Sequence, residues 1–203
     1  MREKLLEAAT RIAIERGLDG ASLRDIADRA GVSSAMISYY FGDRRGLHEA
    51  MFQRAIAAVA AEFEAAVAHP EQEGDPLDAL LRIHATAMAA NPWLPRLIAR
   101  EVLGSEAGFR DRFQAFVGDR PLDVLTDAVD RAIERGHLRC DLDPRLCVIT
   151  LLSLSVFPFL GGPILSEALD LPLDDVFRDR LIAHNREILS RGLRAPASEE
   201  RQA

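Results

Sequence analysis

Hydrophobic residues recur at spacings of three and four along the chain, and no segment alternates with period two for long enough to predict a strand. Several of these segments begin at a capping residue followed by proline, as at Asp75-Pro76, Asn91-Pro92 and Asp143-Pro144, and Asp43 and Asp174 are also expected to cap helix starts. The pattern therefore predicts an all-α fold. The expected helices span residues 2–16, 23–30, 34–40, 44–68, 76–90, 93–103, 106–117, 121–136, 144–160 and 174–191.

Residues 22–41 predict two short helices joined by a tight turn. Ser22 and Asp25 have the spacing of a capping box, in which each side chain bonds the other residue's backbone N–H. Gly31 can adopt the positive φ that a sharp helix end needs, and Ser33 can cap the second helix. The expected inward residues of that helix are Ile37, Tyr40 and Phe41. This arrangement is typical of a helix-turn-helix, whose second helix enters the DNA major groove.

The outward face of the second predicted helix carries short or slender side chains, which suit a major groove about 12 Å wide. These residues are Ser34, Ala35, Met36, Ser38 and Tyr39. Arg24 and Arg44 stand near helix starts, where they could pair with phosphates that helix N-termini also attract. The alternative is an ordinary helical hairpin within an α-helical core.

The segment from Arg2 to Met51 has a specific set of small, apolar and capping residues. They are Leu5, Ala9, Ile12, Ala13, Gly17, Gly20, Ser22, Ile26-Ala27, Ala30-Gly31-Val32-Ser33, Tyr40-Phe41 and Leu47. In these positions the chain resembles the TetR family of bacterial one-component repressors. The resemblance implies an all-helical homodimer with an N-terminal DNA-binding domain and a C-terminal domain that binds a small effector.

The same resemblance places Arg24, Ser34, Met36, Ser38, Tyr40 and Arg44 at positions that usually touch DNA. Two residues depart from the family pattern, because Ser38 stands where tyrosine is frequent and Arg44 where lysine is usual. Together with the outward face, the expected DNA-binding residues are Arg24, Ser33, Ser34, Ala35, Met36, Ser38, Tyr39, Tyr40 and Arg44.

The charge of the chain is unevenly distributed. The 203 residues carry a net charge of −7, yet residues 1–55 hold nine Lys/Arg against eight Asp/Glu. Residues 56–203 hold sixteen Lys/Arg and twenty-four Asp/Glu, so the excess of acidic residues lies outside the predicted helix-turn-helix. DNA binding should therefore be sensitive to salt and should need two such domains. The charged N-terminus carries no signal peptide, and two cysteines fit a reducing cytoplasm, so a cytoplasmic location is expected, at the nucleoid when DNA is bound.

The expected domains are a helix-turn-helix DNA-binding domain at 1–50, an effector-binding and dimerisation domain at 51–192, and a frayed tail at 193–203. Residues 146–166 are uncharged and long enough to cross a bilayer. However, Pro158, Gly161-Gly162 and Pro163 interrupt them, which favours a buried helix followed by a turn. No membrane association is expected.

The predicted helix at 144–160 is apolar on nearly every side, and a stripe of apolar residues follows the helix at 174–191. Because such a helix must be covered all round, these two helices predict a four-helix bundle with a second copy of the chain. A monomeric core is the alternative. The expected interface residues are Leu146, Ile149, Ser153, Val156, Leu160, Phe177, Leu181, His184 and Ile188. A twofold dimer suits palindromic half-sites about 34–36 Å apart.

Aromatic residues and methionine gather in the middle of the chain and suit the lining of a small-molecule pocket. The candidate pocket residues are His84, Met88, Trp93, Leu97, Phe109, Phe113, Phe116 and Phe157. Such a pocket would favour a mostly apolar effector. Plain core packing is the alternative, and His84 is expected to be a satisfied interior histidine rather than a ligand or base.

The sequence contains no G-x-S-x-G, H-E-x-x-H or phosphate-binding glycine loop. His137, Cys140, Asp141, Asp143 and Cys147 are close in sequence, but the cysteine spacing is not that of a zinc site. No catalysis, metal or cofactor is expected. The sequence predicts a transcriptional repressor that a small effector releases from a palindromic operator. The alternative is a dimeric DNA-binding protein without an effector, whose C-terminal domain serves dimerisation or protein contacts.

Overall fold

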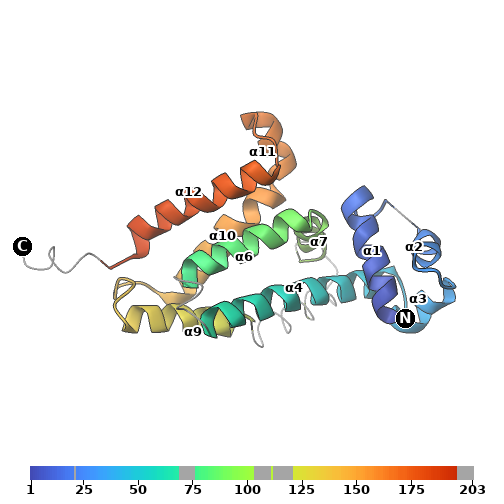
Figure 1. The fold of residues 1–203 in the computed structure, drawn as a ribbon, viewed down its shortest axis with the longest axis horizontal. Coiled ribbons are helices and arrows are strands. Elements are labelled where there is room, and N and C mark those ends of the chain that lie inside the picture. Colours follow the sequence, from blue (N-terminus) through green and yellow to red (C-terminus); the bar gives the residue numbers. More distant parts are fainter. Residues whose placement is uncertain (21, 69–75, 103–110, 112–120, 196–203) are drawn as a thin grey trace, which may run out of the picture. The chain divides into compact units, whose positions relative to one another are not determined.

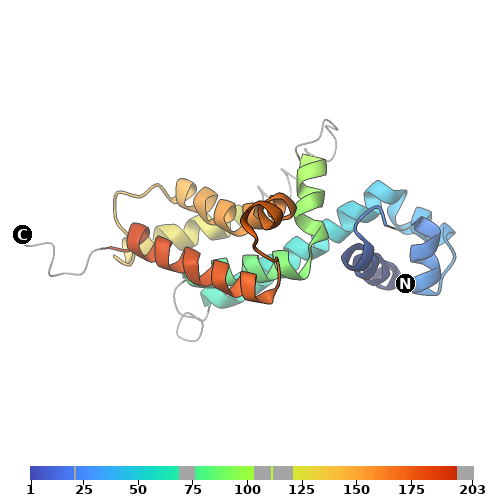
Figure 2. The ribbon, with the colours of Figure 1, turned by 90° about the horizontal axis from the view of Figure 1, so that it is seen from above.

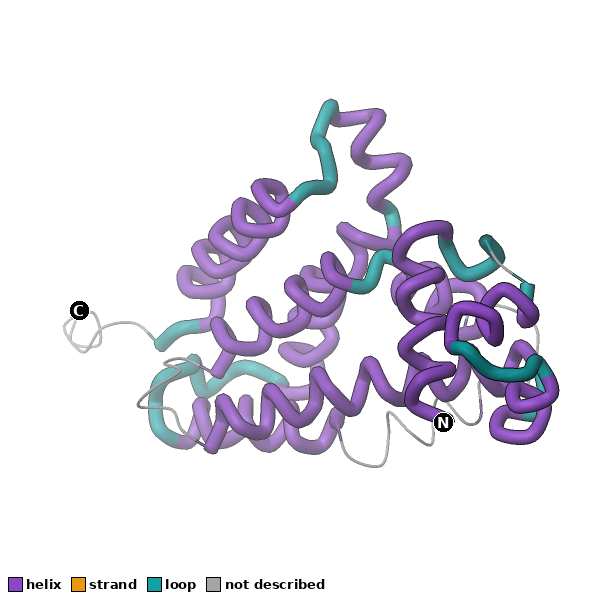
Figure 3. Tube along the Cα trace, turned by 45° about the vertical axis from the view of Figure 1, so that its right-hand side comes forward, coloured by secondary structure: helices purple, strands orange, loops and turns teal. Residues whose placement is uncertain are grey.

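The computed structural model describes residues 1–20, 22–68, 76–102, 111 and 121–195. Within these residues the chain is helical, with one isolated β-bridge between Leu138 and Arg194, so the predicted all-α fold is confirmed (Figure 3). The helices are α1 (Arg2–Arg16), α2 (Leu23–Ala30), α3 (Ala35–Phe41), α4 (Arg44–Ala68), α6 (Pro76–Ala90), α7 (Trp93–Val102), α9 (Pro121–Glu134), α10 (Pro144–Leu160), α11 (Gly162–Leu169) and α12 (Asp175–Leu193).

Side-chain caps define several helix starts, as the sequence predicted. Asp43 accepts the N–H of Gly46 at 2.8 Å at the start of α4, and Asp174 accepts the N–H of Phe177 at 2.8 Å at the start of α12. Asp143 accepts the N–H of Arg145 at 2.9 Å, with proline in the first turn of α10. Each cap satisfies a backbone donor that the helix itself leaves without a partner.

Helix α11 was not predicted, because glycines and proline after Leu160 indicated only a turn. The structure instead begins a new helix there, with Pro163 in its first turn, where a proline lacks only an N–H that no helical bond would use. A Cβ at Gly162 would lie 2.5 Å from Cδ1 of Leu173, so a larger residue there would require the Leu173 side chain to move. The predicted helix at 106–117 falls almost entirely outside the described residues.

The described residues form two compact units, one drawn from residues 1–58 and 90–113 and the other from 59–89 and 114–203. In the first unit, α1, α4 and α7 each contribute apolar side chains that are almost completely buried, including Leu5, Leu47, Phe52 and Leu97. The predicted domain boundary between residues 50 and 51 stays a prediction. Helix α4 begins in the first unit and ends in the second (Figure 1).

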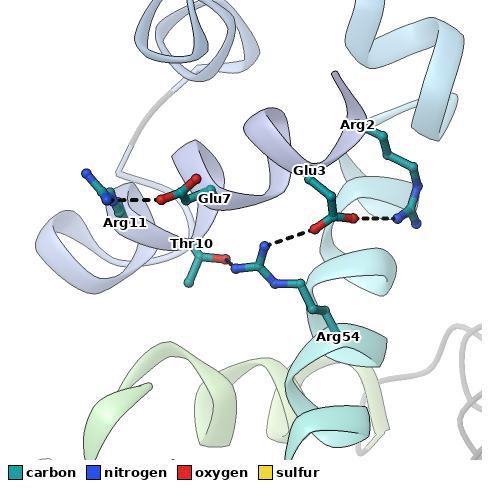
Figure 4. A network of polar contacts seen from close by, with 6 residues as sticks. All are labelled: Arg2, Glu3, Glu7, Thr10, Arg11 and Arg54. Carbon is teal, nitrogen blue, oxygen red and sulfur yellow. Dashed lines mark hydrogen bonds and ion pairs between the residues drawn. The ribbon is translucent and has the colours of Figure 1, made fainter.

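The first unit is also held by polar contacts between α1 and α4. Arg54 of α4 lies between two α1 residues, with Nη1 at 3.5 Å from Oε2 of Glu3 and Nη2 donating to Oγ1 of Thr10 at 3.3 Å (Figure 4). On the other side of α1, Glu15 accepts two hydrogen bonds of 2.8 Å from Arg29 of α2. Arg29 lowers the pKa of Glu15. These surface contacts join α1 to α2 and to α4.

The second unit has one hydrophobic core shared by its helices. Phe63 of α4, Leu81 of α6, Val129 of α9, Leu151 of α10 and Leu189 of α12 all belong to it. Figures 1 and 2 show these helices gathered around one another. Among the described residues, none of the helices combines the length and the apolar composition that crossing a bilayer requires.

The chain after α12 is held against the loop between α9 and α10. The N–H of Arg139 donates to the carbonyl of Leu193 at 3.0 Å, and the N–H of Ala195 donates to the carbonyl of His137 at 3.1 Å. The regular structure therefore runs to Ala195, beyond the point where a frayed tail was expected to begin. Residues 196–203 lie outside the described part of the chain.

Candidate DNA-binding site

The start of α2 carries the predicted capping box. Oγ of Ser22 accepts the N–H of Asp25 at 3.1 Å, and Oδ2 of Asp25 accepts the N–H of Ser22 at 2.7 Å. The Ser22 hydroxyl also donates to Oδ2 of Asp25 at 2.7 Å. These hydrogen bonds stabilise the ionised carboxylate and lower the pKa of Asp25. The reciprocal bonds confirm the capping box and determine where α2 begins.

The turn between α2 and α3 has the hydrogen bonds of a Schellman motif. Gly31 adopts φ 68° and ψ 35°, its N–H donates to the carbonyl of Asp28 at 3.1 Å, and the N–H of Val32 donates to that of Ala27 at 3.0 Å. Helix α3 starts at Ala35, one residue later than predicted, and Oγ of Ser33 accepts the Ala35 N–H at 3.3 Å. The turn thus fixes the direction in which α3 leaves α2.

Helix α3 has one buried side and one exposed side. Ile37 is fully buried against the rest of the unit, whereas Tyr39 is 78% exposed. The exposed side also contains Ser34, Ala35 and Ser38, with Met36 half-buried. The predicted outward face is therefore present, and its side chains are small except for Tyr39.

Tyr40 was expected to point inward, and this expectation is wrong because 36% of the residue is exposed. Its ring stands edge-on to that of Tyr39, with centroids 5.0 Å apart, and tilted against that of Phe41 at 6.3 Å. A tyrosine commonly buries its ring partly while its hydroxyl stays in water. The exposed part is compatible with the DNA contact that the family resemblance implies.

Two predicted phosphate contacts flank α3. The Arg24 side chain in the first turn of α2 is 85% exposed, and its Nε lies 4.0 Å from Oδ2 of Asp28. Arg44 is the first residue of α4 and is half-buried. Ser33 is exposed in the turn before α3. The start of α2, the outward face of α3 and the start of α4 therefore contribute the predicted residues from one compact unit.

Arg2 is a basic residue near α3 that the sequence analysis missed. Its guanidinium carbon lies 5.3 Å from the ring centroid of Phe41, the last residue of α3, and its side chain is 47% exposed. Nη1 of Arg2 also lies 3.4 Å from Oε1 of Glu3, so the positive charge near the end of α3 is paired with a carboxylate. No sequence signal pairs Arg2 with Phe41, because the contact depends on how α1 packs in the folded unit.

The candidate pocket residues fall into three groups. His84, Met88, Trp93 and Leu97 lie on α6 and α7, and the last three are at most 2% exposed. Phe109, Phe113 and Phe116 lie outside the described residues. Phe157 is 59% exposed, so it is not an interior pocket residue. It follows Ile149 by eight residues on α10 and therefore shares its outer face.

Two polar atoms in this set are buried without a hydrogen-bond partner among the described residues. They are Nδ1 of His84 and Nε1 of Trp93, which belong to different units. The expectation that His84 is a satisfied interior histidine is therefore wrong for Nδ1. Burial lowers the pKa of His84 to about 4, so its imidazole is neutral near pH 7.

The predicted interface residues include an exposed apolar group and a partly covered one. Leu146, Ile149 and Ile188 are 60%, 59% and 49% exposed, and Ser153 and His184 are also exposed. Val156, Leu160, Phe177 and Leu181 are half-buried. Phe177 packs edge-on against Phe159 of the same chain, with ring centroids 6.1 Å apart. Helix α10 therefore leaves apolar side chains exposed in a single chain.

The candidate metal cluster does not come together as a site. Cys140 is exposed in the loop before α10, and Cys147 is buried on that helix, where burial raises the pKa of its thiol. Asp143 caps α10, and Asp141 accepts hydrogen bonds of 3.0 and 2.6 Å from Arg139. Across the described ranges, no group of three or more His, Cys, Asp or Glu residues has an arrangement suited to a metal ion.

Comparisons with known proteins agree with this geometry. Residues 5–51 match the family model of the bacterial regulatory proteins of the tetR family. The chain is 40% identical over 55 residues to the HTH-type transcriptional regulator BetI of Burkholderia thailandensis, a match that covers 27% of this chain and 28% of BetI. The match is therefore confined to a little over a quarter of that relative's length.

Solved structures share the fold over nearly the whole chain. The fatty acid degradation regulator FadR of Bacillus halodurans has a TM-score of 0.70 at 19% identity, covering 96% of this chain and 100% of that one. FadR of Bacillus subtilis, solved in complex with stearoyl-CoA, has a TM-score of 0.69 at 17% identity, covering 90% and 96%. Residues 5–51 are therefore similar to the N-terminal segment of the bacterial regulatory proteins of the tetR family, and the solved structures show that the fold is shared over nearly the whole chain.

Proposed function

We propose that this protein is a DNA-binding transcriptional regulator and that α3 is its recognition helix. The observation that carries the proposal is the exposed face of α3, whose small side chains follow a capped turn of defined geometry. Arg24 and Arg44 stand at the two adjacent helix starts, where phosphates are attracted by both the side chain and the helix N-terminus. The name of the BetI relative, a transcriptional regulator, supports this assignment.

The regulator acts as a homodimer on a palindromic operator. Support comes from the apolar face of α10, where Leu146, Ile149 and Phe157 are each about 60% exposed. Val176 and Ile188 of α12 are also exposed, at 63% and 49%. Exposed apolar side chains along two adjacent helices are typical of a contact with another protein. A second copy doubles the number of DNA contacts, which a nearly neutral N-terminal segment needs for tight binding.

The regulator is a repressor that a small, mostly apolar effector releases from its operator. The buried Nδ1 of His84 and Nε1 of Trp93 support an effector, because buried polar atoms without partners are rare and costly. Each could bond a polar atom of a ligand among otherwise apolar neighbours. These two atoms favour an effector over the alternative, in which the C-terminal domain serves only dimerisation or protein contacts. FadR of Bacillus subtilis was solved with stearoyl-CoA.

Within the first unit, α7 is connected to the DNA-binding helices. Arg100 of α7 lies 3.3 Å from a carboxylate oxygen of Asp19, in the loop before α2, and its Nη2 lies 2.9 Å from Nδ1 of His48 on α4. Trp93 is on the same helix as Arg100. A ligand that moves α7 would therefore act on the loop and helix that position the DNA-binding residues. This supports release of DNA by a shift between two conformations.

Selection of bound fragments from a random DNA pool tests the DNA-binding role. The selected sequences should contain a palindrome whose half-sites are about one helical turn apart, as expected for a symmetric dimer. Enrichment of a palindrome supports both the recognition helix and the dimer. If no sequence is enriched at low salt, the proposed function is wrong.

Native mass spectrometry and a thermal-shift screen test the effector. A bound small molecule in the purified protein, or a compound that raises the melting temperature, should also reduce binding to the selected DNA. Apolar compounds with one or two hydrogen-bonding groups are the first to screen. If none of them stabilises the protein and no bound mass is found, the regulator without an effector is favoured.

A further inference from the structure

Helix α10 contains a proline in its interior, which leaves one backbone carbonyl without its helical partner. In an α-helix each N–H bonds the carbonyl four residues earlier, and proline has no N–H. Pro158 therefore cannot bond the carbonyl of Leu154, and its ring crowds the same carbonyl. Leu154 is half-buried, and a carbonyl withdrawn from water needs another donor because an unpaired polar group is costly.

Asn185 of α12 supplies this donor. Its Nδ2 donates to the carbonyl of Leu154 at 3.0 Å, from a residue that is only 4% exposed. Only the amide nitrogen can donate to a carbonyl, so this contact determines how the amide group is oriented. The hydrogen bond joins residues 31 positions apart in sequence and connects two helices of the second unit (Figures 1 and 2).

Apolar packing supports the same arrangement of the two helices. Leu189 lies one turn after Asn185, is 6% exposed, and shares the core of the second unit with Leu151 of α10. In the last turn of α10, Phe159 packs edge-on against Phe177 of α12, with ring centroids 6.1 Å apart. Apolar contacts have no preferred direction, whereas a hydrogen bond needs a defined distance and angle. Asn185 therefore determines the rotation and register of α12 more closely than the apolar contacts do.

The rotation of α12 decides where its exposed apolar side chains lie. Ile188 is 49% exposed and follows Asn185 by three residues, so it stands about 60° around the helix from the buried asparagine. On α10, Phe157 is 59% exposed and directly precedes Pro158. We propose that Asn185 is a positioning residue for the dimer, which holds α12 in register on α10 by bonding the carbonyl that Pro158 leaves free. This inference rests on the homodimer through α10 and α12 proposed above.

A cycle of substitutions at Pro158 and Asn185 in the full chain tests the proposal. Asn185→Leu removes the donor at similar volume and should raise the dimer dissociation constant about tenfold in analytical ultracentrifugation, because α12 loses its register. Pro158→Ala restores an N–H within α10, so in this background Asn185→Leu should change the dissociation constant by less than about twofold. Asn185→Ala also lacks the donor and should follow the same pattern if leucine prevents folding.

Pro144→Ala is the matched control for Pro158→Ala. Pro144 lies in the first turn of the same helix, where an N–H has no carbonyl of the helix to bond, so alanine adds no helical hydrogen bond there. In the Pro144→Ala background, Asn185→Leu should keep its full effect of about tenfold on the dissociation constant. An equal loss in the parent, Pro144→Ala and Pro158→Ala backgrounds would overturn the proposal, since Asn185 would then not act through the Leu154 carbonyl.

Urea unfolding of the same variants, followed by circular dichroism at one protein concentration, separates positioning from stability. Pro158→Ala should also reduce the effect of Asn185→Leu on the unfolding midpoint, because the carbonyl again has a partner. Rescue of the midpoint without any change in the dissociation constant of the folded variants would overturn the positioning role. A monomeric parent chain would contradict both the proposed homodimer and this role, and rescue of the midpoint would then show that the failure lies in the dimer rather than in the hydrogen bond.

Discussion

Arg24 shows how a single exposed side chain can contribute to DNA affinity without reading sequence. Its side chain is 85% exposed, and Nε is 4.0 Å from Asp28, a contact too loose to hold it. Arg24→Ala should weaken binding to all DNA sequences alike, by roughly 1 kcal/mol, and reduce the slope of log affinity against log salt by about one. Fluorescence anisotropy at several salt concentrations, with specific and unrelated DNA, measures both effects.

Arg11→Ala provides the control for that measurement. Arg11 is an exposed arginine of α1 that pairs with Glu7 at 3.0 Å and was not assigned to the DNA contact. Its removal changes the charge equally and should leave the salt slope nearly unchanged. If Arg11→Ala and Arg24→Ala have the same effect, Arg24 has no specific phosphate contact.

His84 should make the stability of the protein depend on pH. Its pKa is about 4 in the folded protein, because burial disfavours the charged imidazole, against 6.5 in the unfolded chain. The unfolded chain therefore binds more protons between these pH values. The free energy of unfolding should be highest above pH 6.5 and fall by up to about 3 kcal/mol as the pH decreases to 4.

Urea denaturation between pH 7 and pH 4.5 measures this dependence. His84→Leu removes the titrating group at similar volume and should flatten the curve over that range. His137→Gln, which changes an exposed histidine, should keep the parent slope. An unchanged slope in His84→Leu would mean that other groups cause the dependence.

The junction between α3 and α4 depends on a close approach of two backbone segments. A Cβ at Gly46 would lie 1.9 Å from the carbonyl oxygen of Phe41, which no side-chain rearrangement can relieve. Gly46→Ala should therefore lower the melting temperature and weaken DNA binding, although alanine normally favours a helix by about 1 kcal/mol. Thermal unfolding followed by circular dichroism tests the first effect, and anisotropy tests the second.

Gly192→Ala is the matched control for the Gly46→Ala variant. Gly192 is also within a helix, and a Cβ there would meet no atom within 4 Å. Its replacement should leave stability unchanged or raise it by up to about 1 kcal/mol. A stabilising effect of Gly46→Ala would show that α3 and α4 do not meet as closely as described.

Local signals predicted most of the described helices, because capping residues and apolar spacing act within a few residues of each other. The starts at Asp43, Asp143 and Asp174 were correct for this reason. Helix α11 was missed because glycine and proline indicate a turn in isolation, whereas proline also fits the first turn of a helix.

The candidate DNA-binding site could likewise be predicted where it depends on residues close together in sequence. The outward face of α3 follows from helical periodicity, so Ser34, Ala35 and Ser38 were placed correctly. Contacts between distant segments, such as Arg2 with Phe41 and Arg54 with Glu3, depend on how the helices pack. Tyr40 was misplaced because spacing alone does not determine how much of a large ring remains exposed.

The low net charge of the N-terminal segment and the exposed apolar side chains of α10 together favour a dimer. The N-terminal 55 residues carry almost no net positive charge, so electrostatic attraction from one copy is weak. The exposed apolar side chains of α10 lie in the other unit, and pairing them would place two recognition helices in one assembly. Affinity for DNA should therefore depend on residues outside the DNA-binding domain.

Phe157→Glu tests that dependence directly. Phe157 is 59% exposed on α10, and a carboxylate there would have to lose its water on pairing, at a cost of several kcal/mol. Analytical ultracentrifugation should show dimers for the parent chain and mainly monomers for the variant, with a large loss of affinity for the palindrome. Ile14→Glu places the same charge on an exposed apolar residue of α1 and should remain dimeric. A dimeric Phe157→Glu protein would exclude α10 as the interface, since an unpaired carboxylate could not be accommodated between two apolar helices.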